Sequence, residues 1–156
     1  MKKHEYALSL RWTGNRGPGT SDYRSYGRDH EITGMRKAAA VLGSSDPHFR
    51  GDATRYNPED LLVASLSACH MLSYLHLCAV NKVVVTAYED DAAGTMAENP
   101  DGSGEFTQVT LRPRVRITTE SDAARALELH EEASRLCFIA RSVNFPVHHQ
   151  PVVSNS

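Results

Sequence analysis

Three cysteines, Cys69, Cys78 and Cys137, are the residues in this chain with the most distinctive chemistry. An odd, small number of cysteines in 156 residues does not form a disulfide framework. Successive cysteines lie 9 and 59 residues apart, and these spacings match no zinc-ligand pattern. Any chemistry that the cysteines carry is therefore the chemistry of thiols.

A long helix is predicted to carry two of the cysteines. Asn57-Pro58-Glu59-Asp60, followed by an apolar run, is typical of a helix that starts with an Asn cap and ends near Cys78 or Ala79. Because apolar residues lie on every side of this helix, we expect it to be central and buried. Nine residues of helix put Cys69 and Cys78 about 13.5 Å apart on roughly opposite faces, so the two cannot form a disulfide. Cys78 is most simply a small packing residue.

Cys69 lies in the middle of this helix, too far from its N-terminus for the helix dipole to activate a thiol. On its own, a buried thiol in this place is inert and has a raised pKa. A reactive Cys69 therefore needs a cation from elsewhere in the fold, and arginine stays charged when it loses water. The candidates, all in segments before the helix, are Arg16, Arg28 and Arg50.

Cys137 is placed near the end of a second helix, which starts at Ser121-Asp122-Ala123-Ala124. A thiol at the end of a helix that faces the central helix can approach Cys69. The separation of 68 positions is no obstacle, because the cost of closing a loop grows slowly with its length. Two adjacent thiols suit reversible oxidation, in which one becomes a sulfenic acid and the other condenses with it.

The remaining segments predict strands and turns, which together make an α+β fold in one domain spanning residues 1–156. The first half should contain strands at 6–12 and 23–32, an ambiguous segment at 35–42 and an extended piece at 48–50. The second half should contain strands at 82–88, 106–118 and 145–153. Turn formers fill residues 13–20 and 99–104.

Composition excludes several classes of partner. The net charge is −2, so the chain lacks the basic character of a nucleic-acid-binding protein. The longest apolar stretch, residues 61–80, is interrupted by polar residues and does not indicate a membrane span. The N-terminus has no apolar signal region, so we expect a soluble cytoplasmic protein.

Eight histidines raise the question of a metal, but the pairs His70/His76 and His148/His149 lack the i, i+4 spacing of a helical site. We expect no metal and no cofactor. A hydrolase with Cys69 as nucleophile and a histidine as base is a weaker reading, because a mid-helix cysteine has no free backbone amides beside it to stabilise an oxyanion.

The chain resembles the OsmC/Ohr family of thiol peroxidases, and more closely its OsmC-like branch. The residues that carry this resemblance are Asn57-Pro58-Glu59-Asp60-Leu61-Leu62, Ser67-Ala68-Cys69-His70, Trp12-Thr13-Gly14, Gly19-Thr20 and Cys137. The resemblance covers nearly the whole chain. It implies antiparallel sheets packed around a long buried central helix, and a tightly intertwined homodimer with two sites at the subunit interface.

The resemblance also implies roles for individual residues. Cys69 would be the peroxidatic cysteine, Cys137 the resolving cysteine, and Glu59 the carboxylate that holds an activating arginine. Glu59 precedes Cys69 by ten residues, about 15 Å along one helix, so a long arginine must bridge the two or a second subunit must supply the carboxylate. Phe138 stands where the family often has proline, and His70 where it often has a bulky apolar residue.

The activating arginine is the least determined residue. The Ohr branch places it in the first turn, where this chain has Arg16, and the OsmC branch places it just before the central helix, where this chain has His48-Phe49-Arg50. We favour Arg50, which would share a strand face with His48, then Arg28, then Arg16.

Two functions follow as expectations. The first is a thiol-dependent peroxidase that reduces organic hydroperoxides, and hydrogen peroxide as well, at the expense of an external dithiol. Such an enzyme is an antioxidant, stress-response protein. The second is a non-catalytic binding module that holds an apolar ligand in a dimer groove, with the cysteines as packing residues.

Overall fold

The computed structural model describes residues 1–156, which form two compact units, Met1–Leu61 and Leu62–Ser156. The first unit contains an antiparallel sheet in the order β1-β2-β3 and a short 3₁₀ helix, η1. Their bounds are β1 Ser9–Trp12, β2 His30–Thr33, β3 Val41–Gly43 and η1 Pro47–Phe49. The predicted loop at 13–20 lies between β1 and β2, as expected.

The strand predicted at 23–32 is mostly a loop, since β2 starts only at His30. The Arg28 side chain holds this loop in place, where strand pairing was expected. Its guanidinium donates hydrogen bonds to the carbonyls of Tyr23, at 2.7 Å, and Tyr26, at 2.5 Å. It also lies over both tyrosine rings, 4.6 Å and 3.9 Å from their centroids.

The prediction of an extended segment at residues 48–50 is also wrong, because the 3₁₀ helix η1 includes residues 48 and 49. Asp46 accepts a hydrogen bond from the His48 backbone N–H at 2.8 Å, and Pro47 supplies a first helical residue that needs no hydrogen bond. Arg50 closes the turn in the left-handed region, with φ 64°. Arg50 and His48 therefore do not share a strand face.

Helix α1, Pro58–Val80, has the N-terminus that the sequence predicted. The Asn57 side chain accepts from the Asp60 N–H at 2.7 Å, and the Asp60 carboxylate accepts from the Asn57 N–H at 3.1 Å, which is a reciprocal capping box. The sequence predicted that this helix would be buried on all sides, but in the single chain only one stripe of it is buried. Leu72, on another side, is 63% exposed. By length and composition alone α1 could also cross a membrane, a property shared by core helices of soluble proteins.

The second unit contains two mixed three-stranded sheets and a second helix. One sheet has the order β4-β7-β9 and the other β5-β6-β8. Within them, β4 and β7 are antiparallel, as are β5 and β6. The pairs β6–β8 and β7–β9 are parallel. The expectation of purely antiparallel sheets is therefore wrong for this unit. Their bounds are β4 Val85–Asp90, β5 Ala93–Glu98, β6 Gly104–Leu111, β7 Pro113–Ile117, β8 Val147–His149 and β9 Val152–Asn155.

The single strand predicted at 106–118 is divided between the two sheets at Arg112. Pro113 has no backbone N–H to continue a ladder, and the Arg112 N–H donates to the Asp90 carboxylate at 2.6 Å rather than to a neighbouring strand. The last predicted strand is divided in the same way before Pro151. Strand β5 was not predicted from the sequence.

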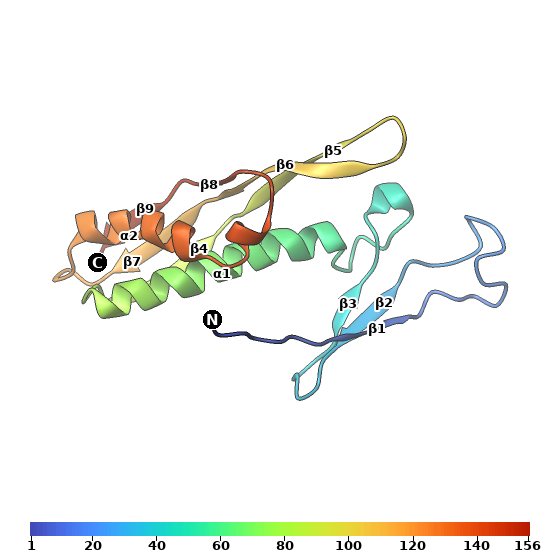
Figure 1. The fold of residues 1–156 in the computed structure, drawn as a ribbon, viewed down its shortest axis with the longest axis horizontal. Helices are drawn as coiled ribbons and strands as arrows, with labels where there is room; N and C mark the ends of the chain where they lie inside the picture. The colour runs from blue at the N-terminus through green and yellow to red at the C-terminus, as the bar shows by residue number, and fades with distance from the viewer. The chain divides into compact units, whose positions relative to one another are not determined.

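Helix α2, Ala123–Leu136, starts with an Asp122 cap and is followed by a short 3₁₀ helix, η2, Ala140–Ser142. In Figure 1, α1 and α2 lie side by side along the strands of this unit. Buried residues from both helices and the first sheet make one core cluster: Tyr74, Leu77, Cys78, Val83, Val115, Ile117, Ala126, Leu129 and Ala133. The expected α+β class is thus confirmed, with α1 as its longest element.

Candidate active site

The structure brings Cys69 and Cys137 together, although 68 residues separate them in the sequence. Cys69 projects from the middle of α1 and is half-buried, whereas Cys137 forms the C-cap of α2 and is 1% exposed. Their side chains lie close enough for Cys69 to raise the pKa of the Cys137 thiol, and neither is in a disulfide. A half-buried thiol therefore lies beside a buried one.

The surroundings of Cys137 keep it protonated. Burial, and then the interaction with the neighbouring Cys69, raise the pKa of the Cys137 thiol to about 11. The Ala140 backbone N–H donates to Cys137 Sγ at 3.4 Å and acts in the opposite direction. At neutral pH Cys137 is therefore a thiol, held in place by the turn that follows α2.

The third cysteine has the structural role that its position predicted. Cys78 is buried in the core cluster beside Tyr74, and burial raises the pKa of its thiol. It lies two and a half helical turns from Cys69 on α1.

A cluster of three imidazoles, two of them buried and one half-buried, joins α1, α2 and β8. His70 of α1 and His130 of α2 are 2% and 1% exposed, and His70 Nε2 lies 3.1 Å from His130 Nδ1. The His149 ring, on β8, is 5.7 Å from the His70 ring. The Tyr74 ring stacks on His130 at 3.8 Å, with planes inclined by 11°.

These imidazoles are neutral in the folded protein. Burial, followed by repulsion from His149, lowers the pKa of His70 to about 4, although the Asp90 carboxylate opposes the shift. Burial and the two neighbouring histidines lower the pKa of His130 to about 3. Burial also lowers the pKa of His149, against the influence of Glu131.

Asp90 links the cysteine-bearing helix to the break between the sheets. Its carboxylate accepts a hydrogen bond from the Ser67 hydroxyl on α1 at 2.5 Å, and its other oxygen accepts from the Arg112 N–H. Ser67 lies two residues before Cys69. Asp90 was not singled out from the sequence, because nothing local shows that two sheets meet there.

The other predicted site residues belong to the first unit. Glu59 is half-buried in the first turn of α1, and Arg50 and Arg16 are exposed. Arg28 is engaged by two carbonyls and two tyrosine rings.

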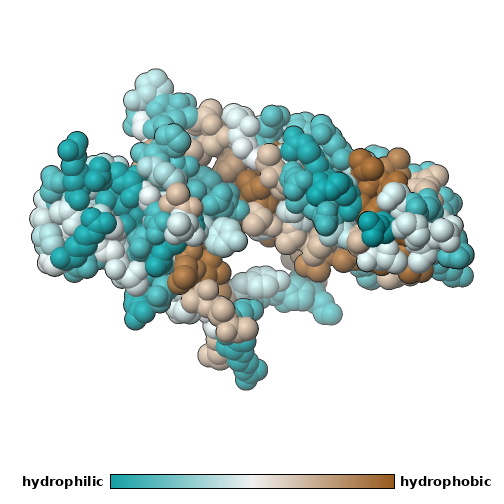
Figure 2. Space-filling model, turned by 180° about the vertical axis from the view of Figure 1, so that it is seen from behind, coloured by the Kyte–Doolittle hydropathy of each residue, from teal (hydrophilic) through white to brown (hydrophobic).

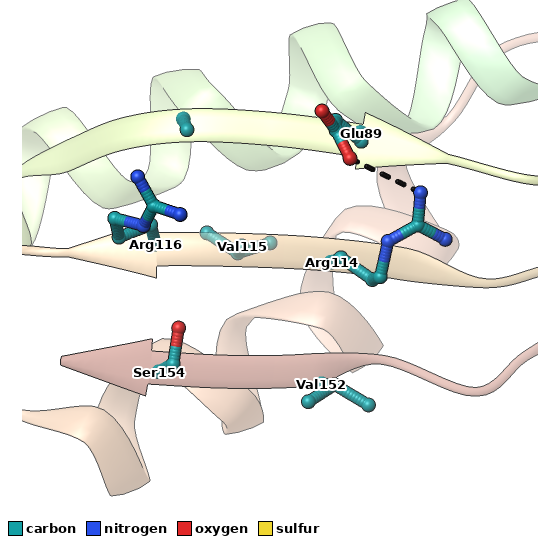
Figure 3. A pocket seen from close by; sticks show the side chains of 7 residues that line it. Glu89, Arg114, Val115, Arg116, Val152 and Ser154 are labelled. Carbon is teal, nitrogen blue, oxygen red and sulfur yellow. Dashed lines mark hydrogen bonds and ion pairs between the residues drawn. The ribbon is translucent and has the colours of Figure 1, made fainter. Parts of the chain in front are cut away.

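A shallow hollow of about 330 Å³ lies elsewhere, on the face of the β4-β7-β9 sheet turned away from the helices (Figure 3). Arg114, Arg116 and Ser154 line it, and Arg114 is paired there with Glu89 at 3.1 Å. No cysteine contributes to this hollow. The structure also contains no group of three or more His, Cys, Asp or Glu side chains arranged to hold a metal ion.

The fold and the paired thiols together define a class of protein. Residues 51–151 match the family model described as OsmC-like protein, so the chain belongs to the OsmC-like family. No curated protein matches the chain significantly.

Solved structures agree with this assignment. An OsmC-like protein of unknown function from Vibrio cholerae is 29% identical, with a TM-score of 0.86 over 96% of this chain and 100% of that one. An organic hydroperoxide resistance protein from Elizabethkingia anophelis is 17% identical, with a TM-score of 0.67 over 99% and 100%. The organic hydroperoxide resistance protein OhrB of Bacillus subtilis is 17% identical, with a TM-score of 0.59 over 95% and 96%. The last two share the fold.

The buried histidines predict that the protein loses stability in acid. Because the pKa values of His70 and His130 are lower in the folded chain than the ordinary 6.5, the unfolded chain binds more protons below pH 6.5. The stabilisation is complete above pH 6.5 and is lost as the pH falls toward 4. For His70 alone, the shift to about 4 corresponds to about 3 kcal/mol. Urea unfolding across this pH range measures the loss.

The double variant His70→Gln/His130→Asn removes both titrating rings, so its free energy of unfolding should vary less with pH. His76→Gln is the matched control, because His76 is exposed on the same helix, and it should leave the dependence unchanged. An unchanged pH dependence in the double variant would contradict the assignment.

Proposed function

We propose that this protein is a thiol-dependent peroxidase that reduces organic hydroperoxides, and also hydrogen peroxide, through Cys69 and Cys137. The observation that carries the proposal is the proximity of these two thiols, which come from different helices and are close enough for Cys69 to affect the protonation of Cys137. Membership of the OsmC-like family supports it, as does the fold shared with proteins named for organic hydroperoxide resistance.

The proposed cycle has three steps. The Cys69 thiolate attacks the O–O bond, takes one oxygen as sulfenic acid, and releases an alkoxide that gains a proton to become an alcohol. The Cys137 sulfur then forms an S–S bond with Cys69, and the sulfenic hydroxyl leaves with the Cys137 proton as water. An external dithiol restores both thiols by exchange and becomes a disulfide itself.

The high pKa of Cys137 fits this order of events. A buried thiol with a pKa of about 11 does not compete with Cys69 for peroxide, because the thiolate is the reactive form. Once Cys69 is a sulfenic acid, the Cys137 proton is the one that the leaving hydroxide requires. The two residues therefore have different roles because their exposure differs.

The Cys69 thiolate needs a cation, and we propose that Arg50 supplies it with Glu59 as its carboxylate partner. The Arg50 side chain is exposed, so it is available for a new contact. Arg28 and Arg16 remain the alternatives. Arg28 would have to leave the two tyrosine rings that hold it.

We propose that the active species is a homodimer in the cytoplasm, in which the partner subunit completes the site. Figure 2 shows hydrophobic patches that interrupt the hydrophilic surface of the single chain. Exposed apolar side chains occur on the β1-β2-β3 sheet (Leu10, Trp12, Leu42) and on α1 (Leu72, Val80). Such surfaces are typical of protein interfaces.

Sedimentation analysis should give twice the 17.2 kDa of one chain. Replacing an exposed interface residue, as in Leu10→Glu, should shift the protein toward the monomer and lower turnover, because it buries a charge at the contact. Lys37→Glu serves as an exposed control that should stay dimeric. A wild-type protein that sediments as a monomer at assay concentrations would overturn the dimer.

Cys69→Ala should abolish dithiol-dependent turnover of cumene hydroperoxide, because no thiolate remains to attack the peroxide. Cys137→Ala should consume peroxide once and then accumulate over-oxidised Cys69, because nothing condenses with the sulfenic acid. Cys78→Ala is the matched control and should retain activity. Peroxide loss and intact-protein mass measure all three variants.

Free-thiol titration separates this function from a non-catalytic binding module, which the exposed apolar side of α1 would also suit. After one equivalent of peroxide, loss of two thiols with a mass decrease of about two hydrogens supports the enzyme. Three intact thiols and undiminished peroxide would support the binding module instead.

Substitution of each arginine by methionine tests the activating cation. Loss of the correct guanidinium should slow the reaction with peroxide, because the Cys69 thiolate loses its neighbouring cation, with a stability close to that of the wild type. We expect Arg50→Met to have this effect and Arg16→Met and Arg28→Met to have less. The rate of peroxide reduction against pH is the measurement, and an unaltered profile in Arg50→Met would move the assignment to another arginine.

A further inference from the structure

A direct hydrogen bond between two buried imidazoles joins the helices that carry the two thiols. His70 Nε2 and His130 Nδ1 are 3.1 Å apart, and both residues are almost completely buried. Burying an imidazole costs free energy unless its nitrogens are satisfied, and an aliphatic residue would fill the same space without that cost. The hydrogen bond is therefore expected to have a role other than packing.

The bond is placed to set the register of the two helices at the thiols. His70 follows Cys69 directly, and His130 precedes Cys137 by seven residues, which is two helical turns on the same face of α2. Farther from the thiols, the Tyr74 hydroxyl donates to the Ala126 carbonyl at 3.0 Å and continues the line of contacts between the helices.

The orientation of the His130 ring is itself fixed. The Tyr74 ring stacks on it at 3.8 Å, so the direction of its Nδ1 is determined by two contacts. Its other nitrogen, Nε2, is buried and has no hydrogen-bond partner. The His130 ring therefore makes its hydrogen bond through Nδ1, to His70.

We propose that His70 and His130 are positioning residues for disulfide formation between Cys69 and Cys137. Their hydrogen bond holds α1 and α2 in the register that keeps the Cys137 sulfur on the Cys69 sulfenic acid. In this step an S–S bond forms, the S–O bond of Cys69 breaks, and water carries away the hydroxide and the Cys137 proton. The inference rests on the proposed function, and it concerns the second step of that cycle, not the attack on peroxide.

Isosteric amides test the proposal, because an Asn side chain places its polar atoms near the Nδ1 position of histidine and Gln near the Nε2 position. His70→Gln and His130→Asn therefore keep the polar atom that makes the bond, whereas His70→Asn and His130→Gln displace it. The measurement is the rate of disulfide formation after one equivalent of cumene hydroperoxide, by thiol loss and mass.

We expect the two position-keeping variants to form the disulfide near the wild-type rate. The two displacing variants should be slowed about tenfold or more, because a misplacement of about 1 Å costs rates of that size. In these variants the over-oxidised form of Cys69 should increase. The first step, followed by dimedone trapping of the sulfenic acid, should be unchanged in all four.

The double variant His70→Leu/His130→Leu keeps the test decisive if single variants fold poorly. Removing both polar partners leaves no unsatisfied group, so we expect it to fold. It should still form the disulfide slowly. Rates that follow the melting temperature instead of the position of the polar atom, or a wild-type rate in this double variant, would overturn the inference.

The wild type separates this inference from the proposed function. If the wild type forms no Cys69–Cys137 disulfide with peroxide, the proposed function fails and the positioning role fails with it. If the wild type forms the disulfide and the displacing variants match its rate, only the positioning role fails.

Discussion

The packing of α1 against α2 is the interaction on which the rest of the second unit depends. It buries the main core cluster, pairs two imidazoles and brings a mid-helix thiol against a thiol at a helix end. Both helices have strong N-terminal caps, at Asn57 and Asp122, which fix where each helix starts and so which face each residue presents. A change of one residue in either start would turn the cysteines away from each other.

Both helices could be predicted from the sequence because their signals are local. The Asn57 and Asp122 caps lie at the two helix starts, and α1 also has two carboxylates in its first turn. The strands were harder, since sheet pairing is set by distant partners. The alternating run around Pro113 showed no obvious break, and the Asp90 carboxylate that accepts from the Arg112 N–H lies 22 positions earlier in the sequence. At Asp46, a side-chain cap converted an expected extended segment into η1.

The thiol pair could be anticipated from the sequence, because residue type and helix position limit what a cysteine can do. The imidazole cluster could not. Sequence spacing groups His70 with His76 and His148 with His149, whereas the fold groups His70 with His130 and His149 from three different elements. Local spacing carries no information about which buried polar groups meet. The cost of burying each of them unpaired is what selects the partners.

The location of Cys137 at the C-cap of α2 gives the two sulfurs unequal freedom of movement. A residue in the middle of a long helix is held by backbone bonds in both directions, whereas a terminal residue can fray without breaking the turns before it. Any movement that an S–S bond between the two would require therefore falls to Cys137 rather than to Cys69.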